Sequence, residues 1–163
     1  MKIIVSDTTA LIVLAKTNHF ELLTSFIEKV YVPNAVMEEL FVKDDGVKYM
    51  IQNMNFIEIK HIENQQILND VKGANLDQGE IEAIALALET KFDLIIDEKA
   101  GRKYAKSKGI EIMGLLGILK INLLNGSINY LELLYILDEF KKVNYRLSPK
   151  LEKEFLESIL IYA

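Results

Sequence analysis

Two short apolar runs, each ending in an aspartate, most constrain the fold of this chain. Asp7 follows the run Ile3–Ser6, and Asp97 follows the run Leu94–Ile96. Short, continuously apolar runs are typical of strands buried on both faces of a parallel sheet. Ligands of such sheets bind at the carboxyl ends of the strands. We therefore expect the two runs to be neighbouring central strands, with both aspartates at one edge of the sheet.

The rest of the chain alternates strand-like and helix-like segments without a linker. Strands are expected at Ile3–Ser6, Val30–Val32, Phe56–Ile62, Leu94–Ile96 and Ile110–Met113. Helices are expected at Thr8–Lys16, from Pro33 to Phe41, at Leu76–Thr90, at Lys99–Lys108, and through most of the chain after Gly114. This alternation predicts one α/β domain over residues 1–163, with a mainly parallel central sheet flanked by helices.

Local turn and cap signals set several of these boundaries. Asn18–Glu21 has the pattern of a capping box that opens a further helix, and Asp44-Asp45-Gly46 is a turn signal ahead of a short helix. Ser148-Pro149 has the composition of an N-cap followed by the first helical turn.

The composition excludes several kinds of protein. Half of the 163 residues are apolar, which is enough for a real core. The absence of Cys excludes disulfides and thiolate metal sites, and two His leave little room for a zinc site. The net charge of -5 is unlike a generally basic nucleic-acid binder, although it does not exclude a local basic patch. No apolar stretch is long enough to span a bilayer, so we expect a soluble, cytoplasmic protein.

Four acids are candidates for one site: Asp7, Glu39, Glu80 and Asp97. The two glutamates are expected near the starts of helices that follow turn signals. Carboxylates gathered at one sheet edge repel each other unless a positive charge lies between them, and hard divalent cations prefer such oxygen ligands. A bound magnesium ion activates water and offsets phosphate charge. The pattern therefore predicts metal-assisted phosphodiester hydrolysis.

Three stretches around these acids resemble a known family. Ile4–Ile12, centred on Ser6-Asp7-Thr8-Thr9, resembles the opening of PIN domains, a family of metal-dependent ribonucleases. Leu76–Ala87 is similar to their second acidic motif, and Leu94–Lys99 with Gly101-Arg102 is similar to the third. In this order they resemble a branch once called a domain of unknown function, related to toxin ribonucleases of toxin–antitoxin pairs.

The resemblance implies a sheet with four acids at its carboxyl edge that bind magnesium or manganese and cut RNA. By motif match, these roles fall to Asp7, Glu39, Glu80 and Asp97. Glu39 is preferred over its neighbour Glu38 because it directly precedes Leu40, which matches a Glu-Leu pair in the family.

Each acid also has a structural interpretation. Asp7 and Asp97 suit helix N-caps, and Glu80 completes a capping-box pattern with Asp77. Glu39 and its neighbour Glu38 suit solvated charges on a helix almost equally well. Geometry favours a site role for Glu80, because it lies about 200° around the helix from Glu82, at about 100° per residue, and shares the packed face. Glu82 and Glu89 mark the face expected to be solvated.

A hydroxyl and a basic segment accompany the acids. Because members of the family it resembles often carry a hydroxyl just after the first Asp, Thr8 or Thr9 is a candidate for orienting a metal-bound water or a phosphate. Ordinary strand-to-helix turn chemistry explains these hydroxyls slightly better. Lys99, Arg102, Lys103 and Lys106 share one helical face directly after Asp97, with Lys108 extending it. Such a stripe suits a nucleic-acid backbone, and it also suits an ordinary solvated face. The family pattern also has a basic residue at the position of Arg102.

Two other phosphotransfer folds fit less well. A haloacid-dehalogenase-like phosphatase needs a second Asp two residues after the first, where this chain has Thr9. A receiver domain needs paired acids after the first strand, whereas Asp7 stands alone.

We therefore expect a magnesium- or manganese-dependent endoribonuclease that cuts single-stranded or structured RNA. The alternative is a catalytically inactive PIN-fold module that binds RNA or a protein partner. The complete set of four repelling acids argues against that alternative. The resemblance alone implies a toxin with an antitoxin protein partner. The apolar segments Leu115–Leu124 and Leu131–Leu137 offer a surface for a homodimer, and they suit the core equally well.

Overall fold

The centre of the protein is a parallel sheet. The computed structural model describes residues 2–43 and 45–163, and within them five strands pair in the order β3-β2-β1-β4-β5. Their bounds are β1 (Lys2–Ser6), β2 (Ile27–Val32), β3 (Ile57–Ile59), β4 (Asp93–Ile95) and β5 (Ile112–Met113). All four pairings are parallel. The predicted α/β architecture is confirmed, and so is the neighbouring position of the first and fourth strands.

The order of the strands creates a switch point at β1. The chain first builds outward from β1 to β2 and β3, then returns to add β4 and β5 on the other side of β1. Ser6 is in register with Ile95, and the backbone N–H of Asp7 donates to the Ile95 carbonyl at 3.0 Å. In open α/β sheets, ligands bind in the crevice at such a switch point. Asp7 and Asp97 follow these two adjacent strands, and the Asp97 N–H donates to the Asp7 carboxylate.

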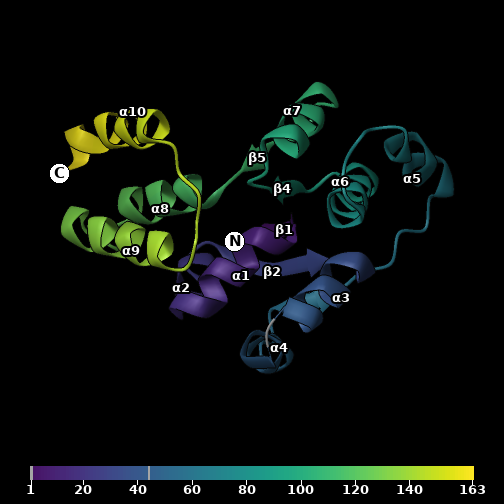
Figure 1. Cartoon of the computed structure of the whole chain (residues 1–163), viewed down its shortest axis with the longest axis horizontal. Coiled ribbons are helices and arrows are strands. Elements are labelled where there is room, and N and C mark those ends of the chain that lie inside the picture. The colour runs from purple at the N-terminus through teal and green to yellow at the C-terminus, as the bar shows by residue number, and fades with distance from the viewer. Residues whose placement is uncertain (1, 44) are drawn as a thin grey trace.

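Helices fill the connections between the strands and make up the C-terminal part of the chain (Figure 1). In order they are α1 (Thr8–Thr17), α2 (Glu21–Thr24), α3 (Asn34–Lys43), α4 (Asp45–Gln52), α5 (Gln65–Lys72), α6 (Gln78–Thr90), α7 (Lys99–Ser107), α8 (Leu115–Leu124), α9 (Tyr130–Lys142), α10 (Pro149–Ile159) and a final 3-10 turn, η1 (Leu160–Tyr162). None of these helices is both long and apolar enough to cross a bilayer, as far as the chain is described.

Several of the helices form two groups beside the sheet. In Figure 1, α8, α9 and α10 stand together at the left, while α5 and α6 lie at the right, with α3 and α4 below them. Helix α6 contacts α3, α5, β1 and β4, whereas α9 contacts α1 and α8. The four acids of interest come from β1, α3, α6 and the end of β4, so the site belongs mainly to the group around α6.

Burial explains why these segments fold as they do. Ile4, Val5, Leu94 and Ile95 are fully buried, as expected for strands covered on both faces. Helix α6 buries a continuous run from Ala83 to Ala87. Its small side chains allow the helix to lie close to β1, β4 and α3. This close packing brings the first turn of α6, with Glu80, to the carboxyl edge of the sheet.

Several local expectations were wrong. Asn18–Glu21 does not form a capping box: Asn18 closes α1 in the left-handed conformation, at φ 57°, and Phe20 precedes α2 without a side-chain cap. Asn tolerates that conformation, which satisfies the last carbonyls of α1. Helix α5 was not expected, because its sequence is mostly polar. Its N-cap is the side chain of Asn64, which accepts from the Ile67 N–H.

Other expectations fit the structure within a few residues. Strand β3 covers only part of the expected run Phe56–Ile62, and Ser148 and Pro149 cap and open α10 as predicted. The predicted turn at Asp44-Asp45-Gly46 includes Asp44, which lies outside the described residues, and α4 begins at Asp45.

Candidate active site

Asp7 lies at the switch point with a side chain that the fold leaves partly unsatisfied. It is 3% exposed and occupies the N-cap position of α1, yet its side chain makes no capping hydrogen bond. Oδ2 accepts from the backbone N–H of Asp97 at 3.4 Å. Oδ1 has no hydrogen-bond partner, and no other buried nitrogen or oxygen among the side chains that the structure describes shares this condition. The backbone N–H of Ala10, in the first turn of α1, lowers the pKa of Asp7, but neither carboxylate oxygen makes a capping hydrogen bond, so helix capping alone does not explain Asp7.

Burial also sets the charge state of Asp7. Loss of solvation raises its pKa well above the usual range, and the negative charges of Asp97 and Glu80 raise it further. A positive charge beside Asp7 would stabilise the ionised form of its carboxyl group.

Asp97 is held by groups that are distant in sequence. The backbone N–H of Leu115, at the start of α8, lies 3.3 Å from both of its carboxylate oxygens, and the Tyr145 hydroxyl donates to Oδ1 at 3.3 Å. The N-cap position of α7 belongs to Glu98, so Asp97 is not that helix's cap. Burial raises the pKa of Asp97 to about 6, although Leu115, Arg102 and Tyr145 each lower it.

The backbone approaches Asp97 closely at Gly114. A Cβ atom at this position would lie 2.6 Å from Asp97 Oδ1 and 2.8 Å from Arg102 Nη1. Only glycine fits there without displacing one of these groups. Arg102 Nη1 in turn donates to the Ile96 carbonyl at 2.8 Å, which anchors the guanidinium beside the carboxylate.

Glu80 serves a structural and an electrostatic role together. Its Oε2 accepts from the Asp77 N–H at 3.2 Å, while its own N–H donates to Asp77 at 2.8 Å, so the capping-box pattern is real. The side chain is nevertheless buried at 8% exposure. Burial raises its pKa, with further increases from the charges of Asp77, Glu98 and Glu39. Glu80 therefore lies in the electric field of the other acids, and it also caps the start of α6.

The expected solvated face of α6 has a different role. Glu82 accepts from the backbone N–H of Ala35 at 3.2 Å, at the start of α3, and Glu89 accepts from the backbone N–H of Glu63 at 2.9 Å. Both glutamates are half-buried and connect α6 to neighbouring segments. The interpretation of this face as simply solvated was wrong.

Glu39 lies in the middle of α3, not near its start as expected. It is half-buried, and its Oε2 accepts from the Thr8 hydroxyl at 2.9 Å, whereas Glu38 is exposed. A Cβ atom at Gly79 would lie 3.1 Å from the same oxygen. The structure therefore turns Glu39, and not Glu38, towards Thr8 and the start of α6.

The four carboxylates form one electrostatic group. Asp7 interacts with Asp97 and Glu80, and Glu80 interacts with Glu39. As arranged, no three His, Asp or Glu side chains among the described residues converge closely enough to hold a metal ion. The donor chemistry nevertheless fits a hard divalent cation, because every donor is a carboxylate oxygen and one buried oxygen lacks a partner.

The basic segment after Asp97 divides into two parts. Lys99, Lys103 and Lys106 are exposed on α7, as a backbone-binding stripe requires. Arg102 is half-buried and donates to the Ile96 carbonyl, so it is held beside Asp97, and its contact with nucleic acid stays a prediction.

Two contributors to the site were missed in the sequence. Tyr145 lies 48 residues beyond Asp97, and no local pattern connects the two. The Leu115 N–H was also missed, although Gly114 directly after the predicted strand Ile110–Met113 is a signal for a close approach of the backbone at the start of a helix.

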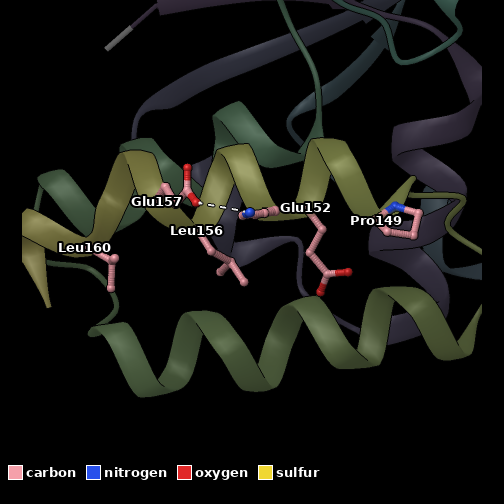
Figure 2. A pocket seen from close by; sticks show the side chains of 6 residues that line it. Pro149, Glu152, Leu156, Glu157 and Leu160 are labelled. Carbon is pink, nitrogen blue, oxygen red and sulfur yellow. Dashed lines mark ion pairs between the residues drawn. The ribbon is translucent and has the colours of Figure 1, made fainter.

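A surface hollow along α10 lies apart from this group. Figure 2 shows its lining, which consists of Pro149, Glu152, Lys153, Leu156, Glu157 and Leu160. Lys153 and Glu157 form an exposed ion pair at 4.0 Å, and none of the four acids lines the hollow. Its lining is mostly apolar and carries no buried acid, so we place the candidate active site at the edge of the sheet.

Comparisons with known proteins identify the family. The DUF3368 family model, described as a PIN domain, matches residues 3–160. The fold is similar to a PilT N-terminus domain protein from the hyperthermophilic archaeon Sulfolobus solfataricus P2, at 18% sequence identity and a TM-score of 0.51, over 76% of this chain and 94% of that one. No curated protein gives a significant match. PIN domains are generally nucleases that use divalent metal ions. The chain belongs to the DUF3368 family of PIN domains.

Proposed function

We propose that this protein is a magnesium- or manganese-dependent endoribonuclease that cuts single-stranded or structured RNA. Asp7, Glu39, Glu80 and Asp97 would hold the metal. The observation that carries the proposal is the buried Oδ1 of Asp7, which has no hydrogen-bond partner in the described residues and lies in the negative field of Asp97 and Glu80. A buried, unpaired carboxylate oxygen is costly unless a ligand compensates it.

The chain's own residues divide the work at this site. Asp7 and Asp97 supply carboxylates at the switch point, fixed by the sheet and by the start of α8. Thr8 holds Glu39 through its hydroxyl, so we assign Thr8 to positioning this acid. When a divalent cation is bound, it lowers the pKa of a coordinated water and offsets the charge of the phosphate.

A cleavage assay tests the proposal. Purified protein is incubated with end-labelled single-stranded and hairpin RNA in magnesium, in manganese and in EDTA. Internal cuts are expected with either metal and not with EDTA. RNA binding without cleavage under every metal condition would favour the alternative, an inactive module that binds RNA.

The exposed lysines of α7 are expected to contact the RNA backbone. Replacing Lys103 and Lys106 together with Ala should weaken RNA binding and reduce the salt dependence, because each lost phosphate contact changes the slope of log K against log salt by about 0.7 on single strands. The measurement is fluorescence anisotropy at several salt concentrations. Replacing Lys150 and Lys153 on α10 is the matched control. A slope unchanged by the α7 substitutions would mean that this face is merely solvated.

We also propose that the protein is the toxin of a toxin–antitoxin pair. The family supports this proposal, since PIN domains often occur in such systems. A neighbouring short reading frame whose product binds this chain and blocks cleavage would support it. A chain that cuts RNA, has no such neighbour and does not arrest growth when expressed would contradict it.

We propose that a second copy of this chain pairs along α9. Most of the apolar side chains of α8 and α9 are buried in the core, but Leu131 and Tyr135 are 75% and 68% exposed and lie one turn apart. The lysines in the last turn of α9 pair with Glu152 and Asp138 of the same chain, so the exposed apolar pair Leu131 and Tyr135 alone carries this proposal. Light scattering of the wild type should give a mass twice that of the 18.6 kDa chain. The Leu131→Glu variant should give the mass of a single chain. A monomeric wild type would contradict the pairing.

A further inference from the structure

The segment between α9 and α10 brings a tyrosine hydroxyl to the candidate active site. Asn144 takes the left-handed conformation at φ 68°, and the next N–H, of Tyr145, donates to the Phe140 carbonyl at 3.1 Å. The Tyr145 ring packs edge-on against Phe140, with 6.2 Å between the ring centroids. Phe140 is fully buried. The tyrosine is therefore anchored in the core before its hydroxyl reaches Asp97.

The contacts of Asp97 differ between its two oxygens. Oδ1 accepts from the Tyr145 hydroxyl and lies against the backbone of Gly114, where no Cβ would fit. Within the described residues, the hydrogen bond recorded for Oδ2 is the one shared with the Leu115 N–H, at 3.3 Å. The protein thus surrounds Oδ1 and leaves Oδ2 as the less engaged oxygen.

We propose that Tyr145 is a positioning residue that holds Asp97 through Oδ1, so that Oδ2 is the oxygen presented to a divalent cation. This inference rests on the proposed function, because it assumes that Asp97 is a metal ligand. Residues that hydrogen-bond to a ligating carboxylate orient it, and their loss typically weakens metal binding by about 10- to 100-fold. Tyr145 acts through Asp97 and is not assigned a contact with the RNA.

The alternative is that Tyr145 only packs against Phe140. Tyr145→Phe distinguishes the two, because it keeps the ring and removes only the hydroxyl. Tyr130→Phe is the matched control: Tyr130 is also half-buried, but it begins α9, about 20 Å along the helix axis from the end that leads to Tyr145.

Isothermal titration with manganese measures the effect without any cleavage step. Wild type and Tyr130→Phe are expected to bind with equal affinity, and Tyr145→Phe about 10- to 100-fold more weakly, with unchanged circular dichroism. Equal affinities for wild type and Tyr145→Phe would overturn the role of Tyr145 and leave the proposed function standing. A wild type that binds no manganese would overturn the metal site itself and this inference with it.

A second measurement uses the wild-type protein alone, in case Tyr145→Phe does not fold. The Cζ carbon signals of the tyrosine rings are followed by NMR during titration with magnesium, which is diamagnetic. The Tyr145 signal should shift as the ion binds, because its hydroxyl bonds to a ligand, while the Tyr130 signal stays in place. A stationary Tyr145 signal in a protein that binds magnesium would overturn the proposal.

Discussion

Replacing Asp7 or Asp97 by Asn is expected to reduce RNA cleavage by a factor on the order of 10² or more, as for the loss of one preorganised electrostatic group. The amide has nearly the same shape as the carboxylate, so the fold around it is kept. The negative charge that a divalent cation needs is removed. Single-turnover cleavage of a labelled RNA in magnesium and in manganese measures the loss, with metal concentration varied so that weakened metal binding is separated from slower chemistry.

Neighbouring glutamates on α3 provide the matched control for this experiment. Glu39→Gln should damage cleavage, because Glu39 is half-buried and bonded to Thr8, whereas Glu38→Gln should be nearly silent, because Glu38 is exposed. A strong effect of Glu38→Gln with a silent Glu39→Gln would show that the wrong neighbour was chosen. Full activity in both Asp variants would exclude these carboxylates as metal ligands.

The features of the site that the sequence predicts are those encoded by local patterns. An apolar run followed by Asp predicts a buried strand and an acid at its end, and both examples occur on adjacent strands. In the same way, the spacing of Asp77 and Glu80 predicts the capping box that the structure contains. Which of these elements lie next to one another depends on the strand order of the sheet. That order is set by the whole fold and cannot be predicted from a short stretch of sequence.

The features that were missed or wrong depend on tertiary contacts. Tyr145 meets Asp97 because the chain after α9 is anchored on Phe140. The hydrogen bond from Arg102 to the Ile96 carbonyl likewise depends on where α7 lies relative to β4. Glu82 and Glu89 have the spacing of a solvated face, yet backbone N–H groups of other segments meet them. In each case a distant partner overrides the pattern of the local sequence.

A divalent cation is expected to raise the melting temperature, because it binds the folded site and not the unfolded chain. At a hundred times its dissociation constant the gain is about 2.7 kcal/mol, which corresponds to roughly 5–10 °C for a domain of this size. Thermal melts in EDTA, magnesium and manganese measure the gain, with sodium chloride at equal ionic strength as the control. Asp7→Asn should melt higher than wild type in EDTA and respond less to magnesium, since burial and Asp97 disfavour the Asp7 charge.

The dependence of stability on pH follows from the raised pKa of Asp97, which is about 6 in the folded protein against an ordinary 3.8. Between these values the folded state binds more protons than the unfolded chain. The contribution of Asp97 to stability is therefore fully present below about pH 4 and is lost as pH rises through about 6. A shift of about two units corresponds to roughly 3 kcal/mol. Without metal, Asp97→Asn should match wild type near pH 4 and become increasingly more stable up to about pH 7.

Urea unfolding of the two proteins in EDTA, from pH 4 to pH 7, measures this difference directly. Taking the difference between wild type and Asp97→Asn cancels the carboxylates that do not interact with Asp97. Asp7 does not cancel: loss of the Asp97 charge removes one cause of its raised pKa, which adds to the gain of the variant in the same direction. A bound divalent cation should remove the difference or reverse its sign above pH 6, because the charged carboxylate then has a partner. A wild type whose stability relative to Asp97→Asn does not change with pH, and which is indifferent to magnesium and manganese at millimolar concentration, would mean that Asp97 is an ordinary structural acid.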